Sequence, residues 1–284
     1  MKYKKIHQTI RPGTWVKSAI MVFFGIMLTR FLLGGGRVKA NLTFGPLTFF
    51  FLALSGMFSV LVLRVVDNPE KTLKDAQIYV IVSGISYVVA LGHSIYHSVS
   101  YNLGVIPVLA VMLLGIVECG IIIYGKTWKY NSFIHPLWNS FLPAFGFFYG
   151  AMIGGVTLPF YVYLLFLAIF ALQLANDIVK NYKAYHEDKE GGAAFMDQIG
   201  SQKIQKGTMG LLGISMICML ISEFLNLPNT FLFLFGMLLD LVLLGIAAGL
   251  IFKVDLGEHY KESINILLKF GIFVQYLTFF LGSV

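Results

Sequence analysis

The chain has 284 residues, of which 57% are apolar and only 12% are charged, and its mean hydropathy is +0.79. A soluble domain of this composition would expose too much apolar surface to stay in solution, so the composition excludes a soluble globular protein. The formal net charge of +7 is typical of basic residues beside anionic lipid, and the hydropathy argues against a nucleic-acid partner.

Nine apolar segments follow one another along the chain, and several reach the roughly 20 residues needed to cross a bilayer. Because most of them are apolar on every side, hydrophobic periodicity does not show which face of each is buried. The sequence therefore predicts an all-α integral membrane protein with nine transmembrane helices, forming one domain over residues 1–284. The predicted segments lie at about residues 14–34, 44–66, 76–98, 104–125, 137–155, 157–176, 207–225, 230–252 and 262–283. The fifth and sixth are joined only by Gly155 and Val156, which predicts a tight hairpin.

The basic residues predict how the protein is oriented in the membrane. If the N-terminus is cytoplasmic, the outer side carries little beyond Arg30, Arg37 and Lys39, and the inner loops carry the rest. We therefore expect a cytoplasmic N-terminus and an external C-terminus, and the lack of an organelle-type transit segment favours a prokaryotic inner membrane. The predicted inner-loop lysines are Lys71, Lys74, Lys126, Lys129, Lys180, Lys183, Lys189, Lys203, Lys206, Lys253 and Lys261.

A first polar cluster, residues 64–75, directly follows the second apolar segment. Asp67 and Asn68 offer the oxygen ligands that Mg²⁺ prefers. Arg64 and Lys71 carry positive charge that suits phosphate groups. On its own, this cluster would be an ordinary basic flank of a transmembrane helix.

A second polar cluster, residues 176–190, follows the sixth apolar segment without a break. Asp177 and Asn181 lie four residues apart, which places them on one helix face where they could share a metal ion. Lys180 and Lys183 lie beside them. Because both clusters fall on the predicted cytoplasmic side, we interpret them as two halves of one site.

The second cluster opens a non-spanning segment, residues 177–206, whose first part to Asp188 is expected to continue the sixth helix. Long loops in compact proteins are usually functional. The alternative is a solvated connector with ordinary surface ion pairs, each worth only about 0.3–0.5 kcal/mol.

Some acidic and histidine side chains fall within the apolar segments. Glu118 and Asp240 are near mid-span, where a charge is costly, so they are expected to face the protein interior. They could make structural hydrogen bonds, move a proton, or couple transport. Glu223, His93 and His97 lie nearer the outer end and are interpreted as interfacial.

Several stretches resemble the UbiA-type intramembrane prenyltransferase superfamily. I-R-P-G-T-W-V-K-S-A-I at residues 10–20 is similar to its first-span signature, and N-D-I-V-K-N-Y-K, followed by F-M-D-Q-I-G near Gly200, is similar to its second Asp-rich motif and the segment after it. The family has nine spans, and its Asp-rich motifs follow the second and sixth. The chain departs from the family because L-R-V-V-D-N-P-E-K-T-L-K-D keeps one clear motif position, Asp67, and because Asn181 stands where Asp is common.

The resemblance implies a helical bundle around a central cavity, with Mg²⁺ and a polyprenyl diphosphate bound at the two motifs. Ionisation of the diphosphate would leave an allylic cation that alkylates a hydrophobic acceptor, and Tyr149, Tyr161 and Tyr163 are candidates to line a tunnel for the prenyl chain. The alternatives are a terpene cyclase, which uses the same ionisation without an acceptor, and a non-catalytic binding or transport protein. The residues carried over are Asp67 and Asp177 as catalytic residues, Asp67, Asn68, Asp177 and Asn181 for the metal, and Arg64, Lys71, Lys180 and Lys183 for the diphosphate.

Overall fold

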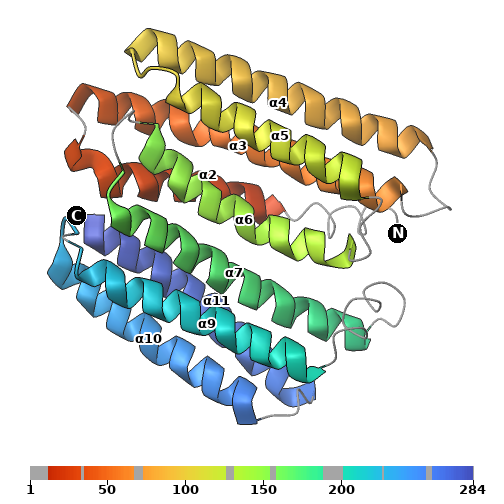
Figure 1. Ribbon diagram of the computed structural model, residues 1–284, viewed down its shortest axis with the longest axis vertical. Helices are drawn as coiled ribbons and strands as arrows, with labels where there is room; N and C mark the ends of the chain where they lie inside the picture. Colours follow the sequence, from red (N-terminus) through yellow and green to blue (C-terminus); the bar gives the residue numbers. More distant parts are fainter. Residues whose placement is uncertain are drawn as a thin grey trace. The chain divides into compact units, whose positions relative to one another are not determined.

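The structure, a computed structural model, describes residues 12–32, 35–66, 73–125, 131–153, 158–187, 201–225, 227–253 and 258–283. Within these ranges the regular structure is helical and no strand occurs, which confirms the predicted all-α class (Figure 1). The helices are α2 (Pro12–Thr29), η1 (Arg30–Leu32), α3 (Gly35–Val66), α4 (Leu73–Tyr101), α5 (Ile106–Gly125), α6 (Asn131–Met152), α7 (Phe160–Glu187), α9 (Ser201–Glu223), α10 (Thr230–Lys253) and α11 (Glu258–Ser283).

Each predicted apolar segment falls on one α-helix of this series. Six helices, α3, α4, α7, α9, α10 and α11, are long and apolar enough to cross a membrane, and α2 and α5 carry shorter apolar stretches. Helix α6 contains Pro136 and Pro143, and neighbouring helices can satisfy the backbone groups that proline frees in a membrane helix.

Two predicted boundaries were wrong. The connection between α6 and α7 is longer than a two-residue hairpin, because α6 ends at Met152 and α7 begins at Phe160. Pro159 lies directly before α7 and its carbonyl accepts a hydrogen bond from the Val162 amide (3.0 Å), so it starts the helix there. Helix α7 continues through the polar cluster to Glu187 as predicted, whereas residues 201–206 belong to α9 and not to a loop.

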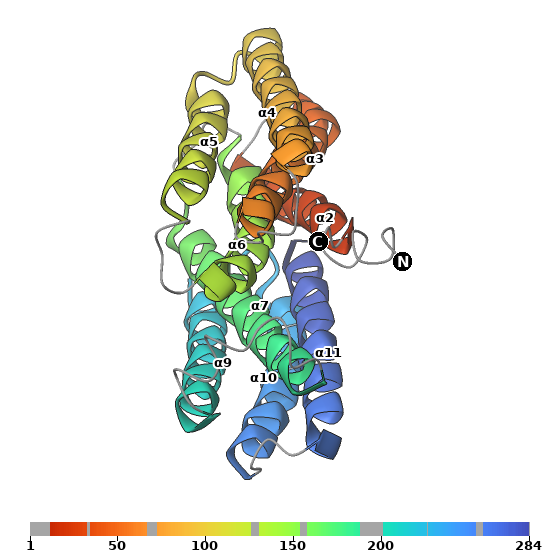
Figure 2. The ribbon, with the colours of Figure 1, turned by 90° about the vertical axis from the view of Figure 1, so that its right-hand side faces the viewer.

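The chain divides into two compact units. Unit 1 comprises Met1–Asn131 with Phe145–Leu158, and unit 2 comprises Ser132–Ala144 with Pro159–Val284. In unit 1, α3 packs against α2, α4 and α5, and α4 also packs against α5. In unit 2, α7, α9, α10 and α11 each pack against two of the other three (Figure 2). The predicted single domain and central cavity stay predictions.

Glycines hold α2 and the C-terminal half of α6 together in unit 1. A Cβ added at Gly150 would lie 2.8 and 2.9 Å from the carbonyl carbon and Cα of Val22, and one at Gly146 would lie 2.5 Å from the Ser18 carbonyl oxygen. A Cβ at Gly25 would collide with the backbone of Phe147. Close backbone approach of this kind replaces the hydrophobic driving force that lipid does not supply.

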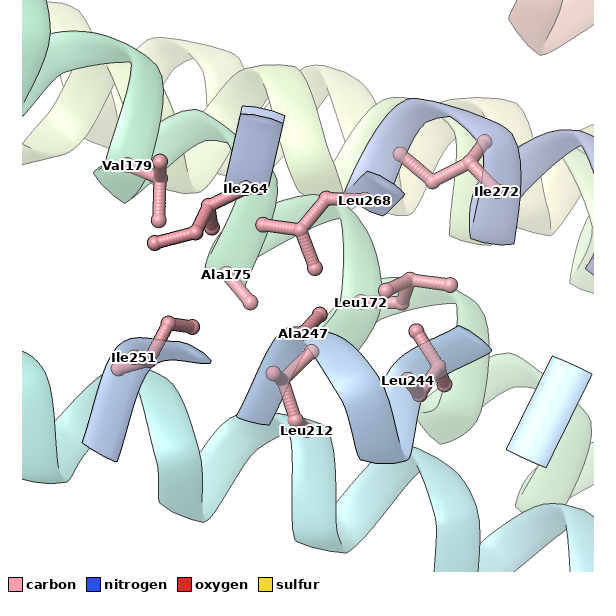
Figure 3. Close-up of a cluster of buried hydrophobic side chains, with 10 residues drawn as sticks. All are labelled: Leu172, Ala175, Val179, Leu212, Leu244, Ala247, Ile251, Ile264, Leu268 and Ile272. Carbon is pink, nitrogen blue, oxygen red and sulfur yellow. The ribbon is translucent and has the colours of Figure 1, made fainter. Parts of the chain in front are cut away.

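Unit 2 has an apolar interior built from all four of its long helices (Figure 3). Leu172, Ala175 and Val179 on α7 face this interior at helical spacing. The other members are Leu212 on α9, Leu244, Ala247 and Ile251 on α10, and Ile264, Leu268 and Ile272 on α11. This packing fixes the rotation of α7, and therefore the direction in which its polar residues point.

Candidate functional site

The second polar cluster begins inside the last turns of a membrane-spanning helix. The apolar part of α7 runs from Phe160 to Lys180. Asp177, within that stretch, is only 8% exposed, while Lys180 is exposed. A carboxylate that is buried one turn below an exposed ammonium group can hold a cation at the boundary between membrane and solvent.

Two further polar residues of α7 share this region. Asn176 is buried, and its Oδ1 has no hydrogen-bond partner within the described part of the chain. Gln173, one turn earlier, donates a hydrogen bond from Nε2 to the hydroxyl of Tyr276 on α11 (2.5 Å). No role for Gln173, Asn176 or Tyr276 was predicted from the sequence. The pattern Q-x-x-N-D within an apolar helix is the signal that could have identified the first two, because i, i+3 and i+4 lie on one face.

The oxygen atoms of this region suit Mg²⁺. The Asp177 carboxylate and the unpaired Oδ1 of Asn176 are adjacent in sequence, both on buried residues. Mg²⁺ takes oxygen ligands, usually one or two carboxylates together with waters and phosphate oxygens. Over the described residues no group of three or more His, Cys, Asp or Glu side chains is assembled, so this half of the site would supply few protein ligands.

Most of the other predicted site residues lie where the structure gives no side-chain description. Asp67, Asn68 and Lys71 lie outside the described residues. Arg64 is on α3, and Asn181 and Lys183 are on α7, but their side chains are not among those described. The two-half-site interpretation therefore stays a prediction, and the described part of the site consists of the α7 residues.

The intramembrane acids are both buried, as expected. Glu118 on α5 is 3% exposed and accepts a hydrogen bond from the Ser55 hydroxyl (2.7 Å). Asp240 on α10 is 1% exposed, and its two carboxylate oxygens have no hydrogen-bond partner among the described residues. It lies against α11, where a Cβ added at Gly271 would be 3.5 Å from its Oδ1.

The two histidines of α4 differ in burial. His97 is fully buried, and its ring stacks on Phe44 of α3 with centroids 5.0 Å apart. His93 is half-buried, and its Nδ1 lies 2.6 Å from the Thr48 hydroxyl. The interfacial position of both histidines stays a prediction, because burial against α3 does not give their depth in the membrane.

The three tyrosines proposed to line a tunnel differ in exposure. Tyr149 on α6 is fully buried in unit 1 and lies 5.4 Å, centroid to centroid, from Phe49. Tyr161 on α7 is buried as well, whereas Tyr163 is 46% exposed. Tyr163 is therefore the least suited of the three to an enclosed tunnel, and the tunnel itself stays a prediction.

Comparison with known proteins identifies the fold. No family model matches the chain, and no curated protein does. A solved structure described as a digeranylgeranylglyceryl phosphate synthase in membranes does match, with a TM-score of 0.71. The match covers 99% of this chain and 98% of the synthase chain. The chain therefore shares the fold of this synthase. The sequence identity is 18%, so the likeness establishes the fold and leaves the activity to be proposed.

Proposed function

We propose that this protein is a membrane prenyltransferase that transfers a prenyl group from a polyprenyl diphosphate to a hydrophobic acceptor. The observation that carries the proposal is the shared fold. It extends over nearly the whole chain, and the matching protein is named as a digeranylgeranylglyceryl phosphate synthase. The buried Asp177 and the exposed Lys180 at one end of α7 support it. The Asp177 carboxylate suits a divalent metal ion, and the positively charged Lys180 ammonium group suits the oxygens of a diphosphate.

The proposed roles follow from the charges of the side chains. Asp67, Asn68, Asp177 and Asn181 hold Mg²⁺, and Asn176 is an additional oxygen ligand on the described face of α7. Arg64, Lys71, Lys180 and Lys183 bind the diphosphate oxygens and stabilise the negative charge that develops as it leaves. When bound, the metal ion neutralises charge on the diphosphate as a Lewis acid.

The reaction balances without an external oxidant or reductant. The bond between the allylic carbon and the diphosphate oxygen breaks, and the diphosphate leaves with the electron pair. The acceptor supplies the electron pair of the new bond and then loses a proton. The described part of the candidate site lies on helix α7, and a helix positions side chains more precisely than a loop does.

The test measures pyrophosphate release by detergent-purified protein. Geranyl, farnesyl and geranylgeranyl diphosphates are supplied with and without Mg²⁺, and the lipid products are extracted. We expect metal-dependent release, and Asp177→Asn should lower the rate on the order of 100-fold because it removes an ionised ligand. Asp67→Asn should act in the same way.

Asp240→Asn is the matched control, because Asp240 is also a buried acid of unit 2 and lies on a different helix. It should leave pyrophosphate release close to the wild-type rate. Wild-type turnover by a folded Asp177→Asn protein would contradict the assigned role. Release of a cyclised hydrocarbon in the absence of any acceptor would replace the proposal with a terpene cyclase.

A further inference from the structure

A buried carboxylate in unit 1 lies within a cluster of hydroxyl groups that the proposed reaction does not use. Glu118 on α5 accepts a hydrogen bond at Oε2 from Ser55 on α3 (2.7 Å). The Ser83 hydroxyl on α4 lies 3.2 Å from that of Ser55 and 2.9 Å from that of Ser59. Ser83 and Ser59 both donate to the Ser55 carbonyl oxygen, at 3.0 and 3.1 Å. All four residues are at most 7% exposed.

The second carboxylate oxygen of Glu118 takes no part in the hydrogen bonds described above. Oε1 of Glu118 is buried and has no hydrogen-bond partner among the described residues. A proton on Oε2 could be donated to Ser55, but it would still leave Oε1 without a donor. No basic side chain of the described part of unit 1 bonds either oxygen. A carboxylate in this position therefore lacks the positive partner that buried charges normally have.

The surrounding atoms show what kind of partner would fit. The cluster offers two carboxylate oxygens and three hydroxyl oxygens. Oxygen-only ligand sets select hard cations over the softer metals that take imidazole or thiolate. With a single acidic group, one positive charge gives a neutral site, whereas a divalent ion would leave net charge in the membrane interior.

The cluster lies within reach of one membrane face. Glu118 is seven residues before the end of α5 at Gly125, and Ser59 is seven residues before the end of α3 at Val66. A helical rise of about 1.5 Å per residue places both roughly 10 Å from those helix ends. The face where α3 and α5 end is therefore the nearer one for a cation that enters this cluster.

We propose that Glu118, Ser55, Ser59 and Ser83 form a binding site for a monovalent alkali cation, with Na⁺ as the probe. The bound ion joins α3, α4 and α5 and stabilises unit 1. This inference is independent of the proposed prenyl transfer, because its test follows binding and stability and needs no substrate.

The experiment compares thermal unfolding of the detergent-purified full chain in NaCl and in choline chloride, each at roughly 150 mM so that ionic strength is constant. The wild-type protein should unfold about 2–4 °C higher in sodium, because a ligand that binds only the folded state stabilises it. Glu118→Gln, which keeps the shape and removes the charge, should unfold at one temperature in both media. Asp240→Asn, the matched buried acid with no hydroxyl cluster, should keep the full sodium response.

A second measurement guards against a variant that does not fold. Radioactive Na⁺ should bind the wild-type protein at equilibrium and be displaced by unlabelled NaCl but not by choline chloride. Ser83→Ala should weaken that binding. Equal wild-type unfolding temperatures in both salts, with no displaceable sodium binding, would overturn the proposal and leave Glu118 holding a proton or contacting water. A sodium response that persists in Glu118→Gln would overturn the assignment to this cluster.

Discussion

The contact between α2 and α6 in unit 1 depends on glycines having no side chain, and Gly150→Ala tests this directly. The three atoms nearest to an added Cβ are all backbone atoms of Val22. Backbone atoms cannot rotate away as a side-chain tip can. The Val22 carbonyl carbon would be 2.8 Å away, while ordinary contact begins near 3.4 Å. The two helices must therefore separate by at least 0.6 Å, the difference between those distances.

A separation of this size matters because dispersion contacts fall off steeply. A gap of about 0.5–1 Å already forfeits a quarter to a half of the contact energy. Overpacking by one methyl group typically costs about 1–3 kcal/mol. For a protein of this size, that range corresponds to a loss of roughly 2–10 °C in unfolding temperature. We expect Gly150→Ala to fall within it.

The assay follows the fraction of monodisperse protein that remains after heating in detergent. Gly249→Ala on α10 is the matched control, because a Cβ there meets nothing within 4 Å. Since alanine is the better helix former by about 0.5–1 kcal/mol, this control should unfold at the same or a higher temperature. If Gly150→Ala, like Gly249→Ala, left the unfolding temperature unchanged or raised it, the close-approach reasoning would be refuted.

Two other substitutions test the interiors of the units. Leu268→Ala removes a fully buried side chain from the unit 2 interior (Figure 3), and it should cost about 2–5 kcal/mol in the free energy of unfolding. Ile266→Ala, on an exposed face of the same helix, should cost far less; equal losses would contradict the assigned faces. Thr48→Val removes the contact to His93 and should cost about 1 kcal/mol. Thr43→Val, at an exposed position, is its control; an unchanged unfolding temperature in Thr48→Val would show that the contact contributes nothing.

The order and type of the helices could be predicted from the sequence because the length of each apolar run is itself the signal. A run of about 20 apolar residues has no other stable form in a bilayer than a helix. The extension of α7 to Glu187 was predictable too, since no proline or glycine interrupts the chain between Phe160 and Glu187. The start of α7 was missed because Pro159 was not recognised as the residue before its first turn.

The interior of each unit could not be predicted in the same way. Periodicity requires a contrast between apolar and polar faces, and most of these helices are apolar on every side. The sequence placed Glu118 near mid-span but gave no sign that Ser55 and Ser83, on two other helices, lie around it. For the same reason the close approach at Gly150 was not foreseen: a glycine in an apolar run is equally compatible with lipid exposure and with a helix crossing.

Both units hold their helices together by more than the burial of apolar surface. Lipid removes most of the hydrophobic advantage of helix association, so close packing and interhelical hydrogen bonds must supply the stability. Unit 1 has backbone contact at glycines and the Ser55–Glu118 cluster. Unit 2 has interdigitated aliphatic side chains together with interhelical hydrogen bonds, such as the one that Ser215 donates to the Ala168 carbonyl oxygen. Helix α7 is fixed by that aliphatic packing through Val179 and Ala175. Asp177 lies between these two anchors in the sequence, so a substitution in the unit 2 interior should displace the carboxylate and impair the proposed site without touching a charged group.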